Sequence, residues 1–210
     1  MVYNSTVTDL VAVGKFQTCH GDVDWTANSL SRRLDLKCSI PNKHHRRSVR
    51  LQGYDYSELG AYFVTVCARD RKSVFGFIVD GEMRLNRFGE IVRETWEGLP
   101  EHYLSIKLGS FIIMPNHIHA VIIITGAGLS PAPTPAHTPL PEIVQALKSF
   151  STRRCNEISG RSGKSIWQRN YYEHIIRSED ELNQISEYVE ANPAQWAEDE
   201  ENPVKAAGHA

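Results

Sequence analysis

The sequence predicts an α+β domain in which antiparallel strands pack with helices. Two stretches, 61–68 and 106–124, are rich in β-branched and aromatic residues, as strands are. A Pro-Asn dipeptide at 115–116 divides the longer stretch, which indicates two antiparallel strands joined by a turn. Apolar residues recur at helical spacing before and after this pair, so the chain mixes helices with antiparallel strands.

The first part of the domain is predicted to contain two strands and a helix. Residues 61–68 (AYFVTVCA) form the first strand, and 75–79 form a short second strand that ends at the Asp-Gly turn signal of 80–81. Asn86 is placed to cap a helix whose apolar residues recur at helical spacing as far as Gly98.

The middle of the chain is predicted to be a hairpin, a loop and a helix. Residues 106–114 and 117–124 form the two arms of the hairpin. The Gly-, Pro-, Ala- and Thr-rich stretch 125–141 cannot form a packed element, so we expect a loop. A helix then opens at Leu140-Pro141, because proline is favoured in the first helical turn.

The last part begins with a flexible basic loop at 159–165 and a strand at 171–177. Ser178 is placed to cap a final helix, and Glu181 three residues later completes the pattern of a capping box. We expect this helix to end before Asn192, which precedes a proline.

The length of 210 residues suits one domain with extensions. Residues 1–42 show weak periodicity and many small polar residues, which predicts a poorly ordered extension. Residues 43–50 (KHHRRSVR) form a basic arm, for which an ordinary flexible linker is the alternative. The domain itself is predicted over 43–196, and an acidic tail over 197–210.

Charge is distributed unevenly along the chain, although the net charge is only −2. Residues 43–177 carry 18 basic and 12 acidic side chains, whereas 178–210 carry 1 and 9. A basic middle is compatible with binding to a phosphate backbone. A solvated surface of mixed charge would give the same counts, so charge alone does not decide.

The composition also bears on the compartment. No run approaches the about 18 apolar residues of a membrane span, and the first 30 residues contain no continuous apolar stretch of a secretory signal. The four cysteines are widely spaced and form no CxxC pair, so we expect free thiols. These features predict a cytoplasmic protein with no membrane partner.

His117 and His119 are the strongest candidates for a metal site. Side chains alternate along a strand, so both imidazoles point to the same face. Two imidazoles on one face can bind a divalent cation that leaves positions open for the oxygens of a phosphodiester. Two histidines on a solvated strand face are the alternative, since an HxH pattern alone is a weak signal.

The last helix offers a nucleophile and a third ligand. Tyr188 and Asn192 are four residues apart and project from one helical face. An amide oxygen is an acceptable ligand for a hard cation. A tyrosine hydroxyl attacks phosphorus only when a cation favours the phenolate. Ordinary packing of a helix tyrosine with a wet hydroxyl is the alternative.

The motifs together resemble those of the single-tyrosine HUH transposases, in which HUH stands for His-hydrophobic-His. The resemblance is to the branch of REP-associated tyrosine transposases, with their IS200-like transposase domain, and it covers residues 43 to about 196. It is carried by RRSVR to GYDY at 46–56, MPNHIH at 114–119, WQ at 167–168, YYEHIIR at 171–177 and YVEANP at 188–193.

The resemblance implies a ferredoxin-like or RRM-like antiparallel sheet with packed helices, the fold of an HUH endonuclease. It implies that His117 and His119 hold Mg²⁺ or Mn²⁺ and that Asn192 occupies the place of the third ligand. It also implies that Tyr188 attacks single-stranded DNA at hairpin-forming repeats, to give a 5′-phosphotyrosine link that a 3′-hydroxyl can later displace. The expected partner is single-stranded or hairpin DNA, and the protein is a monomer or a homodimer.

Tyr171 and Tyr172 are not expected to act as nucleophiles. They open a strand, so they point to opposite faces. Either could instead stack a base, as could Trp167, for which core packing is the alternative. The residues predicted to bind DNA are Arg46, Arg47, Arg50, Lys148, Arg153, Arg154, Trp167, Arg169, Tyr172 and Arg177.

Three other functions remain open. The chain could be a DNA-binding descendant that no longer cuts. It could be a metal-dependent hydrolase that uses water, in which case Tyr188→Phe would stay active. It could be an RNA-binding module, which would need no metal and form no covalent adduct.

Overall fold

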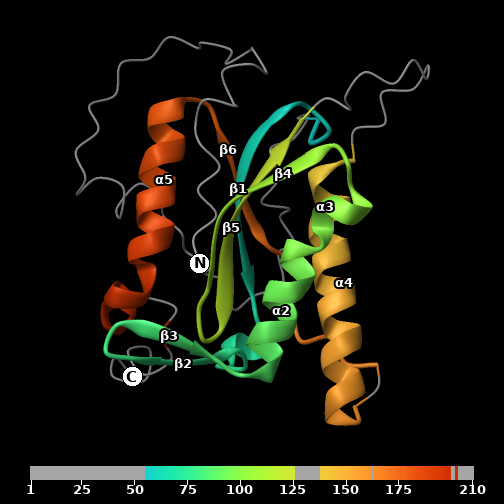
Figure 1. Cartoon of the computed structure of the whole chain (residues 1–210), viewed down its shortest axis with the longest axis vertical. Helices are drawn as coiled ribbons and strands as arrows, with labels where there is room; N and C mark the ends of the chain where they lie inside the picture. The colour runs from blue at the N-terminus through green and yellow to red at the C-terminus, as the bar shows by residue number, and fades with distance from the viewer. Residues whose placement is uncertain (1–54, 126–137, 162, 200–201, 203–210) are drawn as a thin grey trace, which may run out of the picture.

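The computed structural model describes residues 55–125, 138–161, 163–199 and 202. Its centre is an antiparallel sheet in the order β4-β5-β1-β6, which confirms the predicted α+β class (Figure 1). The strands are β1 (Gly60–Cys67), β4 (Ile106–Ile113), β5 (His117–Ile124) and β6 (Tyr172–Ile176). The predicted basic arm with Arg46, Arg47 and Arg50 and the extension 1–42 lie outside the described residues.

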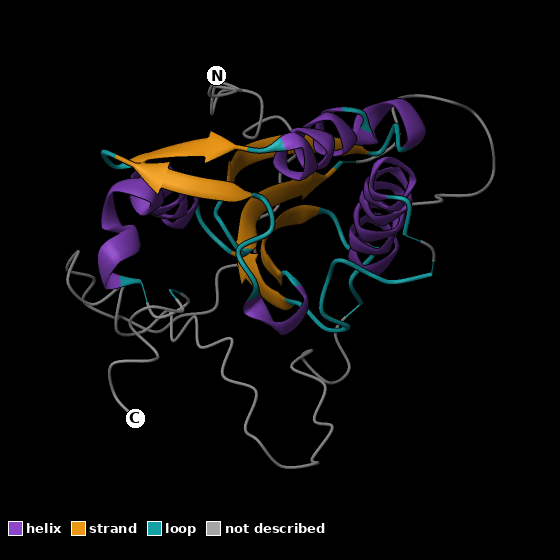
Figure 2. Ribbon diagram, turned by 90° about the horizontal axis from the view of Figure 1, so that it is seen from below, coloured by secondary structure: helices purple, strands orange, loops and turns teal. Residues whose placement is uncertain are grey.

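The sheet separates two layers of helices. On one side lie α2 (Arg87–Glu97), α3 (Leu99–His102) and α4 (Leu140–Ser159), and on the other lies α5 (Glu179–Ala191). Figures 1 and 2 show the sheet between these two sets. None of the described helices is long and apolar enough to cross a membrane.

Strands β1 and β5 are buried on both faces, which explains their nearly continuous apolar sequences. Alternate residues of β1 belong to different clusters. Tyr62, Val64 and Val66 pack in the larger core with α2 and α4, while Ala61 and Phe63 pack in the smaller cluster under α5. The side that α5 covers is therefore a distinct layer.

A close contact explains a glycine in the predicted hairpin. The β4–β5 ladder shifts register between Leu108 and Phe111. A Cβ atom on Gly109 would lie 2.9 Å from the Cβ and Cγ1 atoms of Val121, closer than carbon atoms approach without contact strain. Glycine is therefore required at the register shift, where the β4 backbone lies against the Val121 side chain of β5.

A small second sheet lies at one end of the molecule (Figure 1). It pairs β2 (Gly76–Val79) with β3 (Glu82–Leu85). The turn has positive φ angles at Asp80 (52°) and Gly81 (75°), as a two-residue type I′ hairpin turn requires. The turn predicted at Asp80-Gly81 is therefore confirmed. The strand that follows it, β3, was not predicted, because its sequence EMRL contains two charged residues.

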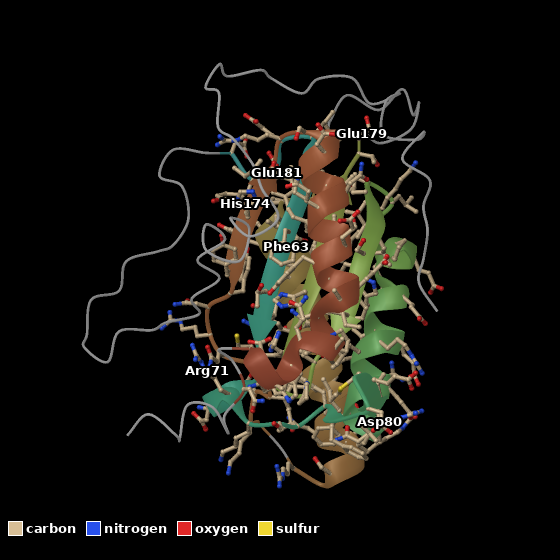
Figure 3. All side chains as sticks on the ribbon, turned by 90° about the vertical axis from the view of Figure 1, so that its left-hand side faces the viewer. Phe63, Arg71, Asp80, His174, Glu179 and Glu181 are labelled. Carbon is tan, nitrogen blue, oxygen red and sulfur yellow. The ribbon has the colours of Figure 1, made fainter. Side chains whose placement is uncertain are left out.

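The last helix begins as predicted, with one difference at its cap. The Ser178 side chain accepts a hydrogen bond from Glu181 N. Glu181 does not return to Ser178; its carboxylate accepts from Arg177 N at 2.7 Å and contacts His174 Nε2 at 2.7 Å (Figure 3). Burial alone would raise the pKa of Glu181, but these hydrogen bonds and the charges of His174 and Arg177 lower it below its ordinary value.

The last helix ends before Asn192, as predicted, and a 3₁₀ segment follows it. Helix α5 stops at Ala191, and a 3₁₀ segment, η4 (Asn192–Glu198), follows with Pro193 in its first turn. Asn202 Nδ2 donates to Trp196 O at 3.0 Å. Helical turns therefore extend to Glu198.

Removing the cap of α5 should weaken the fold measurably. We expect Ser178→Ala to lower the free energy of unfolding by about 1 kcal/mol, because Glu181 N loses its acceptor. Urea denaturation followed by circular dichroism measures this loss. Ser178→Asp, which keeps an acceptor oxygen, should restore most of it; equal losses in both variants would show that the cap does not stabilise the helix.

Candidate metal and nucleophile site

The two histidines lie at the start of β5, side by side and buried. His117 pairs with Cys67 and His119 with Thr65 in the β1 ladder. Their side chains are 0% and 2% exposed, and their Nε2 atoms lie 3.0 Å apart. The predicted common face is confirmed, and the alternative of a solvated strand face is wrong.

Neighbouring polar groups fix the orientation of both rings. Asn116 Nδ2 donates to Arg71 O at 3.2 Å, so its amide oxygen is the atom that lies 2.8 Å from His117 Nδ1. An amide oxygen only accepts, so His117 carries its proton on Nδ1 and leaves Nε2 with a lone pair. His119 Nε2 then donates to His117, and its Nδ1 accepts from Thr65 Oγ1 at 2.9 Å.

Both imidazoles are neutral at pH 7. Burial, with a smaller effect from the charge of Arg71, lowers the pKa of His117 to about 3. Burial and then the neighbouring His117 lower the pKa of His119 well below its ordinary value. Neutral imidazole is the form that binds a cation, so the pair need not lose charge first. His119 would only have to move its proton from Nε2 to Nδ1.

Tyr188 reaches this pair from α5. Its ring centre lies 5.4 Å from that of His119. Phe63 contacts both rings, stacked on His119 at 5.4 Å and edge-on to Tyr188 at 6.4 Å. Figure 3 shows Phe63 between β1 and the middle of α5. The tyrosine is half-buried, so its position against the histidines is set by packing.

Asn192 follows on the same side of α5. Tyr188, four residues earlier, packs on His119, and Trp196, four residues later, lies 6.1 Å from the His117 ring. Asn192 keeps helical angles (φ −56°, ψ −42°) between them and is 3% exposed. Its Oδ1 is buried and has no hydrogen-bond partner among the described residues. A buried amide oxygen without a partner is costly, so this atom suits a ligand.

These residues could hold a divalent cation. Two imidazole lone pairs and one amide oxygen make three donors, which leaves positions open. No cluster of three or more His, Cys, Asp or Glu residues occurs within the described ranges. A third donor in this part of the chain would therefore come from a residue of another type, as Asn192 is.

The two adjacent tyrosines separate as predicted. Tyr171 packs against the larger core, whereas Tyr172 lies on the α5 side, where it pairs with Thr65. Burial raises the pKa of Tyr172 above its ordinary value. A raised pKa opposes phenolate formation at Tyr172, whereas the Tyr188 ring is in contact with the His119 ring.

The structure divides the other predicted DNA contacts. Lys148, Arg153 and Arg169 line one open groove. Arg154 instead forms an ion pair with Glu94 of α2. Arg177 follows Ile176, which pairs with Ala61 at the end of β1 far from the histidines. Arg154 and Arg177 therefore do not line this groove, and their contacts with DNA stay predictions.

Trp167 is part of the core. It is 2% exposed, lies 4.7 Å from the Phe75 ring and donates from Nε1 to Ser151 Oγ at 2.9 Å. The expected stacking on a base is wrong for this residue, because no ring face is open. The alternative of core packing holds.

Sequence reasoning missed the residues that support the site. Phe63 and Thr65 lie on another strand, and only the register of β1 against β5 brings them to His119. Asn116 was noticed as part of the motif, but its bond to His117 depends on the turn geometry. The one available signal for Thr65 was a polar residue inside an otherwise apolar strand.

Residues 56–192 match the protein family described as Transposase IS200 like, and the chain belongs to this family. It is 38% identical over 172 residues to an uncharacterised protein of Haemophilus influenzae. The aligned region covers 75% of this chain and 93% of that protein. It is 26% identical over 147 residues to a Haemophilus influenzae protein named as a REP-associated tyrosine transposase, covering 66% and 73%.

Among solved structures, the chain resembles that of a REP-associated tyrosine transposase bound to a REP hairpin. The TM-score is 0.49 and the identity 18%, with 70% of this chain and 73% of that chain covered. The family resemblance expected from the motifs is thus confirmed by the sequence match.

The hydrogen bonds predict one tautomer for each histidine. In the metal-free protein at pH 7, His117 should carry its proton on Nδ1 and His119 on Nε2. Long-range ¹⁵N–¹H NMR of the imidazole rings measures this directly. Asn116→Ala should allow His117 to populate the other tautomer; a wild-type His117 protonated on Nε2 would contradict the arrangement.

Proposed function

We propose that this transposase cleaves and rejoins single-stranded DNA through Tyr188, with a divalent cation held by His117, His119 and Asn192. One observation carries the proposal: the Tyr188 ring lies 5.4 Å from a buried histidine whose Nε2 converges with that of a second histidine. A nearby cation can activate a tyrosine for attack on phosphorus, and the two histidines beside Tyr188 supply nitrogen ligands for such a cation.

The donor set supports Mg²⁺ or Mn²⁺. Neutral imidazoles and an amide oxygen accept either ion, and Asn192 Oδ1 has no other partner among the described residues. Such an ion would polarise the scissile phosphate and offset the charge of the transition state.

The chain's own residues perform the transfer. Phe63 and His119 hold the Tyr188 ring, so the phenolic oxygen is oriented before DNA arrives. That oxygen attacks phosphorus and loses its proton to solvent. The P–O3′ bond breaks, the leaving 3′-oxygen takes up one proton, and the 5′-phosphate stays on Tyr188. A second 3′-hydroxyl reverses these steps, so DNA is rejoined without ATP.

Hairpin-forming repeats are the substrate that we propose, because a 26% identical relative carries the name REP-associated tyrosine transposase. The cytoplasm is the proposed site of action.

The nucleophile can be identified by its covalent product. Labelled single-stranded hairpins from the sequence flanking the gene are incubated with Mg²⁺ or Mn²⁺ and separated on denaturing gels. The wild-type protein should give a covalent protein–DNA band that Tyr188→Phe abolishes. Tyr172→Phe, on the same side of the sheet, should still form the band.

Each other result points to a different function. Cleavage without a covalent band that persists in Tyr188→Phe would indicate a hydrolase. Binding to the hairpin without cleavage would indicate an inactive descendant. Binding to an RNA strand of the same sequence, without metal dependence, would indicate an RNA-binding module.

Thr65 should tune the affinity for the cation. When both Nε2 atoms bind a cation, His119 must carry its proton on Nδ1, and Thr65 Oγ1 lies 2.9 Å away to accept it in a hydrogen bond. We expect Thr65→Val to weaken Mn²⁺ binding by about 10–100-fold, as loss of such partners does. Titration calorimetry measures this, and Thr65→Ser, which keeps the hydroxyl, should bind nearly as wild type; equal affinities in Thr65→Val and wild type would contradict the role.

A further inference from the structure

A groove with a volume of about 1330 Å³ opens beside the histidine end of the sheet. Its walls are η3 (Arg69–Arg71), one side of α4, and the segment 163–169. Six cationic side chains and one acidic side chain, Asp70, line it. The cationic residues are Arg69, Arg71, Lys148, Arg153, Lys164 and Arg169.

The positive charge of this groove is not neutralised by the described part of the chain. Arg69, Lys164 and Arg169 are exposed and form no ion pair with a described carboxylate. By contrast, Arg87 and Arg154, which lie outside the groove, form ion pairs with Glu94. Like charges gathered in a concave surface attract an anion and raise its local concentration.

The floor of the groove contains two buried polar groups. Lys148 is 8% exposed, and its Nζ donates to Arg169 O at 2.9 Å. Burial lowers its pKa to about 8, an effect that a bound anion would oppose. Thr152, one helical turn later on α4, has a buried Oγ1 without a hydrogen-bond partner among the described residues. An ammonium and a hydroxyl on one helical face can together bind a phosphate oxygen.

The inner end of the groove, at Arg71 and Gln168, is linked to the candidate site by hydrogen bonds and strand pairing. Gln168 N donates to Cys67 O at 2.9 Å, and Cys67 pairs with His117. Arg71 O accepts from Asn116 Nδ2, and the charge of Arg71 lowers the pKa of His117. In Figure 3, Arg71 lies at the end of α5 opposite to His174 and Glu181.

We propose that this groove holds the single DNA strand that adjoins the scissile phosphate. Its backbone phosphates contact Arg69, Lys164 and Arg169 along the rim, and one phosphate contacts Lys148 and Thr152 at the floor. A polyanion fits better than a small anion, because the cations follow the groove from its inner end at Arg71 outward. The assignment rests on the proposed function, since the strand must run to Tyr188.

The test measures binding rather than cleavage, so it can fail or succeed independently of the nucleophile. Fluorescence anisotropy follows a labelled single strand, taken from the sequence flanking the gene, on Tyr188→Phe protein across a salt series. In that background the groove variant is Arg69→Gln, Lys164→Gln and Arg169→Gln. The control variant removes the same number of positive charges outside the groove, by Arg84→Gln, Arg93→Gln and Lys107→Gln.

Each single-strand phosphate contact contributes about 0.7 to the slope of log affinity against log salt. The groove variant should therefore lose about 2 units of slope and about 100-fold in affinity at 0.1 M salt. The control should stay within about 3-fold of its parent. Lys148→Met should weaken binding separately, and circular dichroism confirms that each variant is folded.

Shortening the strand on either side of the cut tests its path. Removing the flank that lies in the groove should abolish the difference between the groove variant and its parent, whereas removing the other flank should preserve it. Equal losses in the groove variant and the control would overturn the proposal. It would also be overturned if neither truncation changed the difference, or if an RNA strand of the same sequence bound more tightly than the DNA.

Discussion

The buried imidazole pair at the start of β5 is the constraint on which the rest of the site depends. Two polar rings with less than 3% exposure are costly unless their nitrogens have partners. Asn116 and Thr65 provide those partners on the outer nitrogens, so the inner nitrogens are forced toward each other. Helix α5 covers this face of the sheet and brings Tyr188 to His119. Asn192 follows directly after the helix.

The sheet assigns different tasks to its two faces. The face toward α2 and α4 carries most of the apolar core, including Trp167, and fixes the register of the strands. The face toward α5 combines a smaller apolar cluster with the polar residues of the site. Because β1 contributes Phe63 and Thr65 to this second face, the strand that supports the core also positions the rings of His119 and Tyr188.

The sequence predicted what local periodicity determines. The common face of His117 and His119 follows from strand alternation, and the spacing of Tyr188 and Asn192 follows from the helical repeat. The contacts of Phe63 and Thr65 depend on strand register, which no local pattern specifies. Trp167 was assigned to DNA for its side-chain type, but its burial in the core, which no local pattern specifies, decides otherwise.

The central claim is that His117, His119 and Asn192 bind a cation beside Tyr188. Mn²⁺ provides a direct spectroscopic test of it. Tyr188→Phe protein containing ¹⁵N-histidine is loaded with Mn²⁺ and studied by pulsed electron paramagnetic resonance. The account predicts couplings to two ¹⁵N nuclei, of which one disappears in His117→Ala. Bound Mn²⁺ without any histidine nitrogen coupling would contradict it.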